Sequence, residues 1–334
     1  MADRPPRLVI RRERLAIVFW VATALMCGLA LTQLAAFTWI PLVWMLQALT
    51  PYLLLPALPA AVMAAWRRHW TATTVHAGLL LVLLWLTGPV LWHDSPPAPA
   101  AGAPRLTITS ANVYSQTDRP ADAAAALLAT DADVVAVTEY SADVAAAFAN
   151  AGAADTHPFV AAEAPGDRNG VALYSRYPIT TQSVARLGQG LTVDATLDVA
   201  GTPVRVVVVH PLPGTDGESL ASWFDDLHAL RDTVEPSSGP GGVATMIVGD
   251  FNATRWHPAF RELLDRGWHD AHELLGQGFS RSWPTDLSIP PLVRIDHALV
   301  DDRVSPIAVH DLDVPGSDHR GFVLEVAVPL PGST

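Results

Sequence analysis

Long apolar stretches occupy the first part of the chain, and short apolar runs recur through the rest. Residues 15–66 form 52 consecutive positions without Asp, Glu, Lys or Arg, and residues 69–93 form another 25. A helix that crosses a bilayer needs about 20 apolar residues, so the first stretch has room for two crossings and the second for one. We therefore predict three transmembrane helices, at about residues 15–35, 40–65 and 74–92, within an N-terminal membrane anchor of residues 1–93.

The middle predicted helix contains Pro51, Pro56 and Pro59. Proline interrupts a soluble helix because it lacks the backbone N–H, but spanning helices tolerate it where neighbouring groups satisfy the freed carbonyls. The limits of this helix are consequently the least defined by the sequence.

A polar region follows the anchor. Residues 94–104 read DSPPAPAAGAP, a Pro/Ala-rich composition that predicts an extended, semi-rigid linker. The 230 residues of 105–334 are enough to form one domain with a sizeable core.

Short runs of β-branched and apolar residues predict buried strands in this domain at 106–113, 134–138, 170–174, 191–199, 204–209, 245–248, 295–300 and 322–328. Helical composition between them predicts helices at 120–129, 142–149, 220–234 and 258–264. The runs 134–137 and 206–209 are apolar on both faces, which is typical of a sheet covered on both sides in a layered α/β domain.

Charge divides the chain at the same place as hydrophobicity. Through Arg68 the chain has seven arginines against Asp3 and Glu13, a net charge of +5, and because the total is −12 the remainder carries −17. These arginines precede the first predicted helix or follow the second, so the positive-inside rule places both groups in the cytoplasm. Three crossings would then put everything after Trp92 outside the cytoplasm, at the plasma membrane. A cleaved signal peptide is the competing interpretation of the first helix, but its apolar run is too long and more spans follow.

Composition excludes several function classes. All 21 basic residues are arginine, so no lysine is available for a Schiff base or a phosphate-binding P-loop. The only cysteine, Cys27, lies in an apolar run, which excludes a disulfide framework within the chain, a thiolate zinc site and an iron–sulfur cluster.

Polar residues fall at the ends of the predicted strands. An ionisable group inside an apolar strand is costly unless it is paired, whereas a group at a strand end can face a cleft that several strands share. Together these positions predict one site formed by Asn112, Glu139, His210, Asp250, Asn252, Asp296, Asp318 and His319.

Each position also has a purely structural explanation when it is taken alone. Glu139 could cap a helix ahead of Ser141, Asp250 with Asn252 could form an Asx turn, and His210 could be a turn histidine. Asp318 and His319 could cap a strand, and Asn112 could pair with neighbouring backbone.

Two further motifs have open interpretations. His269 and His272 in WHDAHELL invite a zinc interpretation, but the spacing is not that of HExxH, and a surface helix turn is favoured. Trp283 could line the cleft or only pack the domain.

In their order along the chain, these motifs resemble the endonuclease/exonuclease/phosphatase superfamily with the DNase I-like fold. The resemblance covers residues 106 to about 328 and rests on the Asn-bearing first strand, the Glu after the second, NGVALYSRYPI at 169–179, the strand that ends in His210, GDFN, RIDHAL and SDHR. It implies an α/β (α+β) four-layer sandwich in which helices flank two packed mixed β-sheets, preceded here by the three spans.

The resemblance also implies roles for the site residues. Mg²⁺, with Mn²⁺ as the alternative ion, would be held by Glu139, Asn112 and Asp318, since hard cations prefer oxygen ligands. His319 would activate water or contact the phosphate while Asp296 holds its ring, because a carboxylate on one ring nitrogen fixes the tautomer. Asp250 would orient the attacking water or protonate the leaving group. Substrate contacts and further leaving-group chemistry would come from Asn112, Asn169, His210 and Asn252. Phosphoester hydrolysis needs positioning and charge neutralisation, which this set can provide without lysine.

The superfamily includes DNA repair nucleases, secreted DNases, sphingomyelinases, inositol phosphatases and membrane-tethered bacterial phosphatases. A domain that carries −17 without lysine is a poor match for duplex DNA, and a short linker would hold the site near the lipid surface. We therefore expect the lipid bilayer as a partner and a lipid-linked phosphate or pyrophosphate as the substrate. In layout the chain resembles the actinobacterial teicoplanin-resistance type of membrane protein, for which an undecaprenyl pyrophosphate phosphatase role is proposed. The alternatives are an extracytoplasmic nuclease, a sphingomyelinase-like phosphodiesterase or a non-catalytic scaffold, and the sequence leaves the oligomeric state open.

Overall fold

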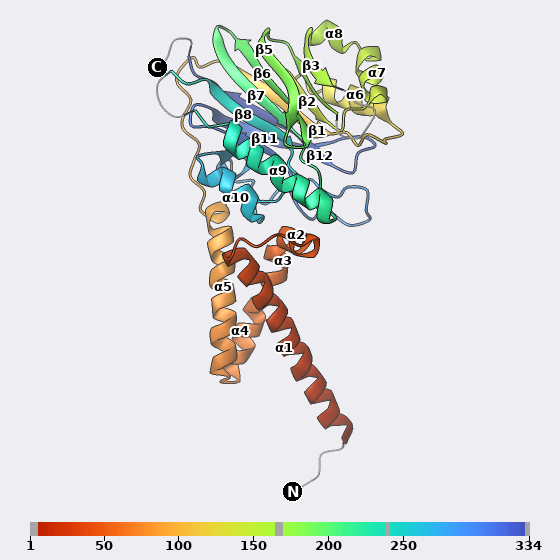
Figure 1. Cartoon of the computed structure of the whole chain (residues 1–334). Helices are drawn as coiled ribbons and strands as arrows, with labels where there is room; N and C mark the ends of the chain where they lie inside the picture. Colours follow the sequence, from red (N-terminus) through yellow and green to blue (C-terminus); the bar gives the residue numbers. More distant parts are fainter. Residues whose placement is uncertain (1–5, 164–169, 238–240, 331–334) are drawn as a thin grey trace. The chain divides into compact units, whose positions relative to one another are not determined.

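A computed structural model describes residues 6–163, 170–237 and 241–330 (Figure 1). The chain divides into two compact units: one runs through Pro89 and includes residues 256–258, and the other contains residues 90–255 and 259–334. The predicted limits of the linker and the catalytic domain stay predictions.

The N-terminal unit is helical. It contains α1 (Pro6–Leu34), α2 (Pro41–Ala48), α3 (Thr50–Leu54), α4 (Ala57–Trp66) and α5 (Trp70–Leu91). Two segments, Glu13–Leu34 and Trp70–Leu91, are long and apolar enough to cross a membrane, with 22 residues each. These helices indicate a membrane anchor.

The predicted middle span, residues 40–65, is not one continuous helix. It breaks into α2, α3 and α4, and the pair Pro41–Ala48 and Thr50–Trp66 is bent by 79°. The prolines explain the breaks, because Pro41 and Pro51 lie in the first turns of α2 and α3 and Pro56 is the N-cap of α4. The anchor therefore has two candidate spans, or three if the bent pair counts as one.

The second unit contains two mixed six-stranded sheets. The first has the order β11 (Ser305–Asp313), β12 (Arg320–Ala327), β1 (Arg105–Asn112), β2 (Val134–Thr138), β4 (Val171–Ser175), β3 (Phe159–Glu163). The second has the order β5 (Ile179–Leu187), β6 (Gly190–Val199), β7 (Thr202–Val209), β8 (Ala244–Asp250), β10 (Asp296–Val300), β9 (His269–Asp270). The pairs β1–β2 and β7–β8 are parallel, and the other ladders are antiparallel.

The main core lies between the sheets. Alternate residues of each central strand face it, such as Leu106 and Ile108 of β1 and Val206 and Val208 of β7. The other face of β2 packs, through Val135 and Val137, against the helices described next.

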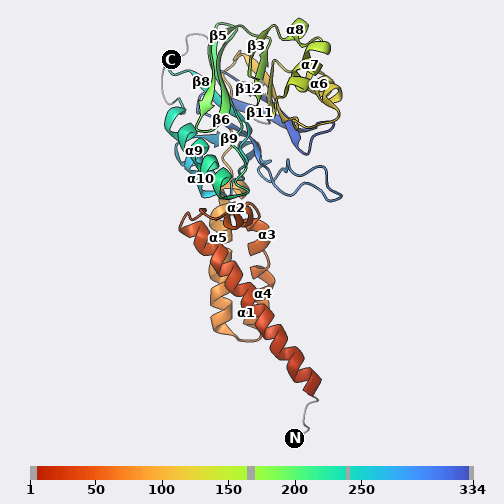
Figure 2. The ribbon, with the colours of Figure 1, turned by 45° about the vertical axis from the view of Figure 1, so that its right-hand side comes forward.

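Helices cover the sheets. On the first sheet these are α6 (Pro120–Leu128) and α7 (Ala142–Asn150), followed by the single turn α8 (Ala153–Thr156). Along the second sheet lie α9 (Gly217–Thr233) and α10 (Pro258–Asp265), as Figures 1 and 2 show, and the short α11 (Ala271–Leu274) follows β9. An Asp216–Ser219 capping box starts α9, and its buried Trp223 donates a hydrogen bond of 3.2 Å to the Phe251 carbonyl.

Every predicted strand and helix of this unit is present, with ends shifted by a few residues. The sequence pattern missed β3, β5, β9 and β11, which are the four edge strands of the two sheets. Edge strands such as β5 expose much of their length, so they lack the apolar runs that identified the central strands.

Candidate active site

The polar residues at the strand ends come together because the strands that bear them are neighbours. In the parallel β1–β2 pair, Asn112 lies opposite Thr138, and the Asn112 Nδ2 donates to Glu139 Oε1 at 3.2 Å. The parallel β7–β8 pair places His210 beside Asp250, with 3.8 Å between His210 Nε2 and Asp250 Oδ2. Each sheet therefore contributes a polar pair at the carboxyl ends of its parallel strands.

Two contacts connect the two sheets at this site. The Asn112 Nδ2 also donates to Asp250 Oδ2 at 3.0 Å, which connects β1 of the first sheet to β8 of the second. His319, just before β12, donates from Nδ1 to Asp296 Oδ2 at 2.8 Å, and Asp296 begins β10. The site therefore lies where the two sheets meet, and most of its side chains are nearly inaccessible to solvent.

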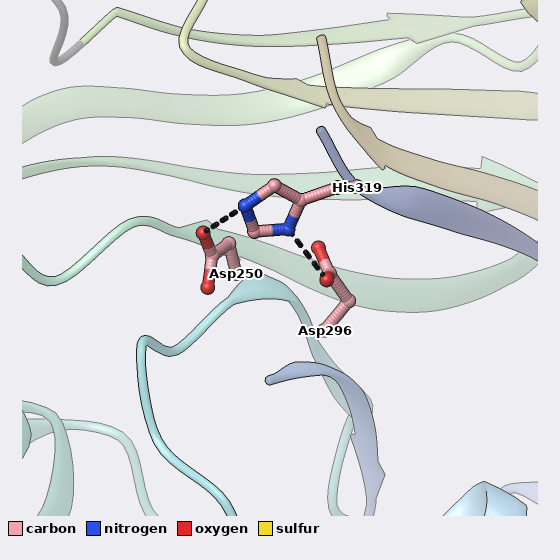
Figure 3. A group of neighbouring side chains, drawn as sticks. All are labelled: Asp250, Asp296 and His319. Carbon is pink, nitrogen blue, oxygen red and sulfur yellow. Dashed lines mark hydrogen bonds and ion pairs between the residues drawn. The ribbon is translucent and has the colours of Figure 1, made fainter. Parts of the chain in front are cut away.

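Asp250, Asp296 and His319 form a buried cluster with ligand atoms within 4.8 Å of one another (Figure 3). The His319 ring lies between the two carboxylates, and its Nε2 is 3.7 Å from Asp250 Oδ2. Among the described residues, Asp296 Oδ1 and Asp318 Oδ1 are buried oxygens without a hydrogen-bond partner. Such oxygens fit a hard divalent cation, because Mg²⁺ prefers carboxylate ligands.

Glu139 points into the site through an unusual backbone conformation. Its φ of +55° is in the left-handed region, which is costly for a residue with a Cβ and is concentrated at functional sites. Ser141 caps α7, which rules out Glu139 as the cap. The Glu139 Oε2 instead accepts from the Ser115 N–H at 2.8 Å and from the Ser115 hydroxyl at 2.9 Å.

These contacts keep Glu139 charged. Burial alone would raise the pKa of Glu139, but His210 and the hydrogen bonds from Ser115 and Asn112 outweigh it and hold the pKa below its ordinary value. Glu139 is thus an anion near neutral pH, as a carboxyl group that binds a metal must be.

The GDFN turn presents Asp250. Gly249 has a φ of +138°, and a Cβ there would lie 2.2 Å from the Val209 carbonyl oxygen, so only glycine fits between β7 and β8. The Asx turn does form, because the Asn252 N–H donates to Asp250 Oδ1 at 2.8 Å, while Oδ2 remains directed at Asn112 and the two histidines. The Asn252 Nδ2 donates to the Pro211 carbonyl at 2.9 Å, which fixes the segment after His210.

The pKa values of His319 and Asp250 are both raised in the cluster, for different reasons. Burial would lower the pKa of His319, but Asp296, Asp250 and Asp318 together raise it to about 10. Burial is the main cause that raises the pKa of Asp250, and the negative charge of Asp296 adds to it. His319 is therefore an imidazolium at neutral pH, whereas Asp250 is a carboxylate with an increased affinity for a proton.

Asp318 and Trp283 form the more exposed rim. The Trp283 Nε1 donates to Asp318 Oδ2 at 3.1 Å, and 38% of Trp283 is accessible to solvent. Of the two interpretations of Trp283, the structure favours a position beside the site.

Three serines that the sequence did not single out also hold the site. Ser115 binds Glu139, Ser282 accepts from the backbone N–H of Asp296, and Ser317 accepts from the His319 N–H while donating to the Asn112 carbonyl. Serines are frequent in loops, so no sequence pattern distinguishes these three.

Asn169 lies outside the described residues. The surface helix turn expected at WHDAHELL is wrong for His272, which is 1% exposed and follows the buried Asp270, the N-cap of α11. His269 is the more exposed histidine, and its Nε2 lies 2.9 Å from Asp302 Oδ1. The burial of His272 arises because β9 pairs with β10, a contact that local sequence does not reveal.

A phosphoester hydrolase of DNase I-like fold is the class that this fold and site define. Residues 109–319 match the endonuclease/exonuclease/phosphatase family, so the chain belongs to that family. The match extends over the described site from Asn112 to His319.

Solved structures share the fold at low sequence identity. A D. rerio TDP2 humanized by 14 mutations aligns with a TM-score of 0.55 and 16% identity, covering 67% of this chain and 99% of its own. The endonuclease/exonuclease/phosphatase from Beutenbergia cavernae aligns with a TM-score of 0.52 and 20% identity, covering 67% and 72%. The 3′ phosphatase NExo from Neisseria, bound to a product DNA hairpin, aligns with a TM-score of 0.51 and 18% identity, covering 66% and 98%. No curated protein sequence matches the chain.

Proposed function

We propose that this protein is a membrane-anchored, metal-dependent phosphohydrolase that acts outside the cytoplasm on a lipid-linked phosphate such as undecaprenyl pyrophosphate. The observation that carries this proposal is the buried Asp250–Asp296–His319 cluster, with Glu139 beside it, on a chain whose N-terminal helices suit a bilayer.

The acidic groups of the site would hold the divalent cation. Glu139, Asn112 and Asp318 are the ligands that the family resemblance implies. The geometry adds the carboxylates of Asp250 and Asp296, whereas the charged ring of His319 between them would not be a ligand. A bound Mg²⁺ would neutralise charge on the phosphate oxygens.

The protein's own side chains can do the rest of the chemistry. Asp296 holds a proton on His319 Nδ1, so the charged ring can donate from Nε2 to a phosphate oxygen. Asp250 is buried with an increased proton affinity, which suits a group that orients water and takes its proton. Asn112 bridges Glu139 and Asp250 and keeps both carboxylates in place.

Charge and attachment support a lipid substrate. The part of the chain after Arg68 has a net charge of −17 and no lysine, which opposes binding along a polyanionic DNA backbone. Tethering to the bilayer raises the effective concentration of lipid head groups. The layout of spans followed by the domain also resembles the teicoplanin-resistance membrane proteins, which would connect this activity to the cell envelope or glycopeptide resistance.

Nucleic acid is the second candidate. NExo is a 3′ phosphatase bound to a DNA product, and a D. rerio TDP2 structure contains a single-strand DNA product. A sphingomyelinase-like phosphodiesterase would fit the membrane equally well.

Parallel assays can separate these substrates. The full chain, purified in detergent with Mg²⁺, is offered undecaprenyl pyrophosphate, sphingomyelin and DNA, together with Glu139→Ala, His319→Ala and the exposed-histidine control His269→Ala. We expect phosphate release from undecaprenyl pyrophosphate by the wild type and by His269→Ala, and its loss in the other two variants. Cleavage of DNA alone would refute the lipid substrate, and equal product release by all four proteins would refute catalysis at this site.

Orientation is tested separately. A reporter active only outside the cytoplasm, fused after Thr334, is expected to give a signal. A silent fusion beside a signal from a cytoplasmic reporter at the same point would reverse the proposed topology.

A further inference from the structure

A buried ion pair lies next to the strands that carry the two catalytic aspartates. Asp270, 2% exposed at the end of β9, accepts from Arg294 Nη1 at 2.9 Å through Oδ1 and at 2.7 Å through Oδ2. The same carboxylate lies 2.7 Å from Nδ1 of the fully buried His297. The His297 Nε2 donates to the Ala253 carbonyl at 2.9 Å.

This network contacts both segments that present the catalytic carboxylates. Ala253 belongs to the turn that follows Asp250, and His297 is the residue after Asp296 on β10. Because successive side chains of a strand point to opposite faces, Asp296 faces the site while His297 faces away from it. The network therefore acts on the backbone of the site and contacts no reacting atom.

The contacts also fix the orientation of the His297 ring. A carbonyl oxygen can only accept, so Nε2 must carry a hydrogen to bind Ala253. Asp270 and Arg294 then occupy the Nδ1 side, with Arg294 Nη1 at 2.9 Å from it. A backbone–backbone hydrogen bond, from the Phe251 N–H to the Ile295 carbonyl at 2.9 Å, also ties the same two segments together.

We propose that Asp270, Arg294 and His297 are positioning residues that set the separation of Asp250 and Asp296 on either side of His319. The proposal rests on the hydrolase activity proposed above, because turnover is one of its readouts. Displacing a catalytic group by about 1 Å can cost about 100-fold in rate, and outer hydrogen-bond partners of metal ligands typically contribute about 10- to 100-fold.

Four single variants of the full chain in detergent test this role: Asp270→Asn, His297→Leu, His297→Gln and Asp301→Asn. Asp301 is the matched control, because it is a buried carboxylate that accepts backbone N–H groups from Ser237, Thr245 and Arg303 at the far end of β10. The rates with undecaprenyl pyrophosphate and the rise in Tm caused by Mg²⁺ are measured for each.

We expect Asp270→Asn and His297→Leu to lower kcat by about 10- to 100-fold with KM within about twofold of wild type. The glutamine amide of His297→Gln can donate to Ala253, so this variant should recover at least about tenfold of the rate lost in His297→Leu. Asp301→Asn should lower Tm and leave kcat within about twofold. A folded Asp270→Asn or His297→Leu protein with wild-type kcat, or an equal loss of kcat in Asp301→Asn, would overturn the proposal.

Asp270→Asn removes the closer of the two carboxylate partners of the buried Arg294 and leaves only Glu273, at 3.9 Å, among the described residues. If that variant does not fold, Asp270→Asn combined with Arg294→Gln replaces it under the same criteria. A wild type that is inactive on undecaprenyl pyrophosphate contradicts the proposed function alone. The positioning role is then decided by the Mg²⁺-induced rise in Tm, which should shrink in Asp270→Asn and His297→Leu but not in Asp301→Asn. An equal rise in all proteins, or none in the wild type, contradicts it.

Discussion

Replacing Asp296 by asparagine removes one charge from the catalytic cluster while it preserves the shape of the side chain. The carboxylate accepts from His319 Nδ1 at 2.8 Å and is 2% exposed. Asparagine can still accept this hydrogen bond, but it cannot stabilise the imidazolium by charge. The remaining acids, Asp250 and Asp318, lie at 3.7 Å and 4.0 Å from Nε2, on the opposite side of the ring.

The expected decrease in kcat follows from the loss of the charged hydrogen-bond partner of His319. A hydrogen bond to a charged group contributes about 1.5–3 kcal/mol. At 1.36 kcal/mol for each factor of ten, this corresponds to a fall in kcat of about 10- to 150-fold in Asp296→Asn. The pKa of His319, which Asp296 helps to raise, should fall in the same variant.

Steady-state hydrolysis of undecaprenyl pyrophosphate, followed as phosphate release between pH 6 and 10, measures both effects. Asp194→Asn is the control, because Asp194 is a partly exposed carboxylate that binds Arg205 on the neighbouring strand at 2.6 Å. We expect this control to keep wild-type kcat. If Asp296→Asn folds and turns over at the wild-type rate, the proposed role of the Asp296–His319 pair is wrong.

Three further outcomes are expected. Gly249→Ala should lower the free energy of unfolding by about 1–3 kcal/mol, measured by denaturant titration, since its Cβ would collide with the Val209 carbonyl; Gly217→Ala, where nothing lies within 4 Å, should be neutral, and equal effects would contradict the argument. In metal-free protein, the stability that His319 adds relative to His319→Gln should be fully present below pH 6.5 and lost as pH rises through about 10, because the folded-state pKa is raised; thermal melts that show the difference growing with pH would reverse this sign. Stripping divalent ions with a chelator should abolish hydrolysis, and Mg²⁺ or Mn²⁺ should restore it, whereas full activity after chelation would exclude a metal requirement.

Burial on both faces is what made the central strands predictable. Strand β2 and residues 206–209 of β7 are continuous runs of apolar or β-branched residues because each lies inside a sheet that is covered on both sides. The edge strands β3 and β11 take part in the same sheet through backbone hydrogen bonds on one side, which leave little trace in the side chains. The local sequence pattern indicates which strands are buried. It indicates strand pairing only where the paired strands are also buried.

The apolar anchor shows the same limit. Length and hydropathy identified three apolar segments, but the 79° bend between Pro41–Ala48 and Thr50–Trp66 depends on how the chain continues after each proline. The positions of the prolines are visible in the sequence, but they do not specify the bend between the helices.

The sequence identified which residues form the candidate site. The tertiary structure determined how those residues are arranged. Asn112, Glu139, Asp250 and His319 could be named because polar groups at the ends of apolar strands are costly unless they share a site. The contact between Asn112 and Asp250 joins residues 138 positions apart in sequence, and it exists only because β1 and β8 belong to sheets packed face to face. The same holds for the buried Asp270 network, which local sequence presented as a surface turn. Side-chain chemistry along the chain determines which groups must avoid an apolar interior, whereas the packing of distant strands decides which of those groups meet.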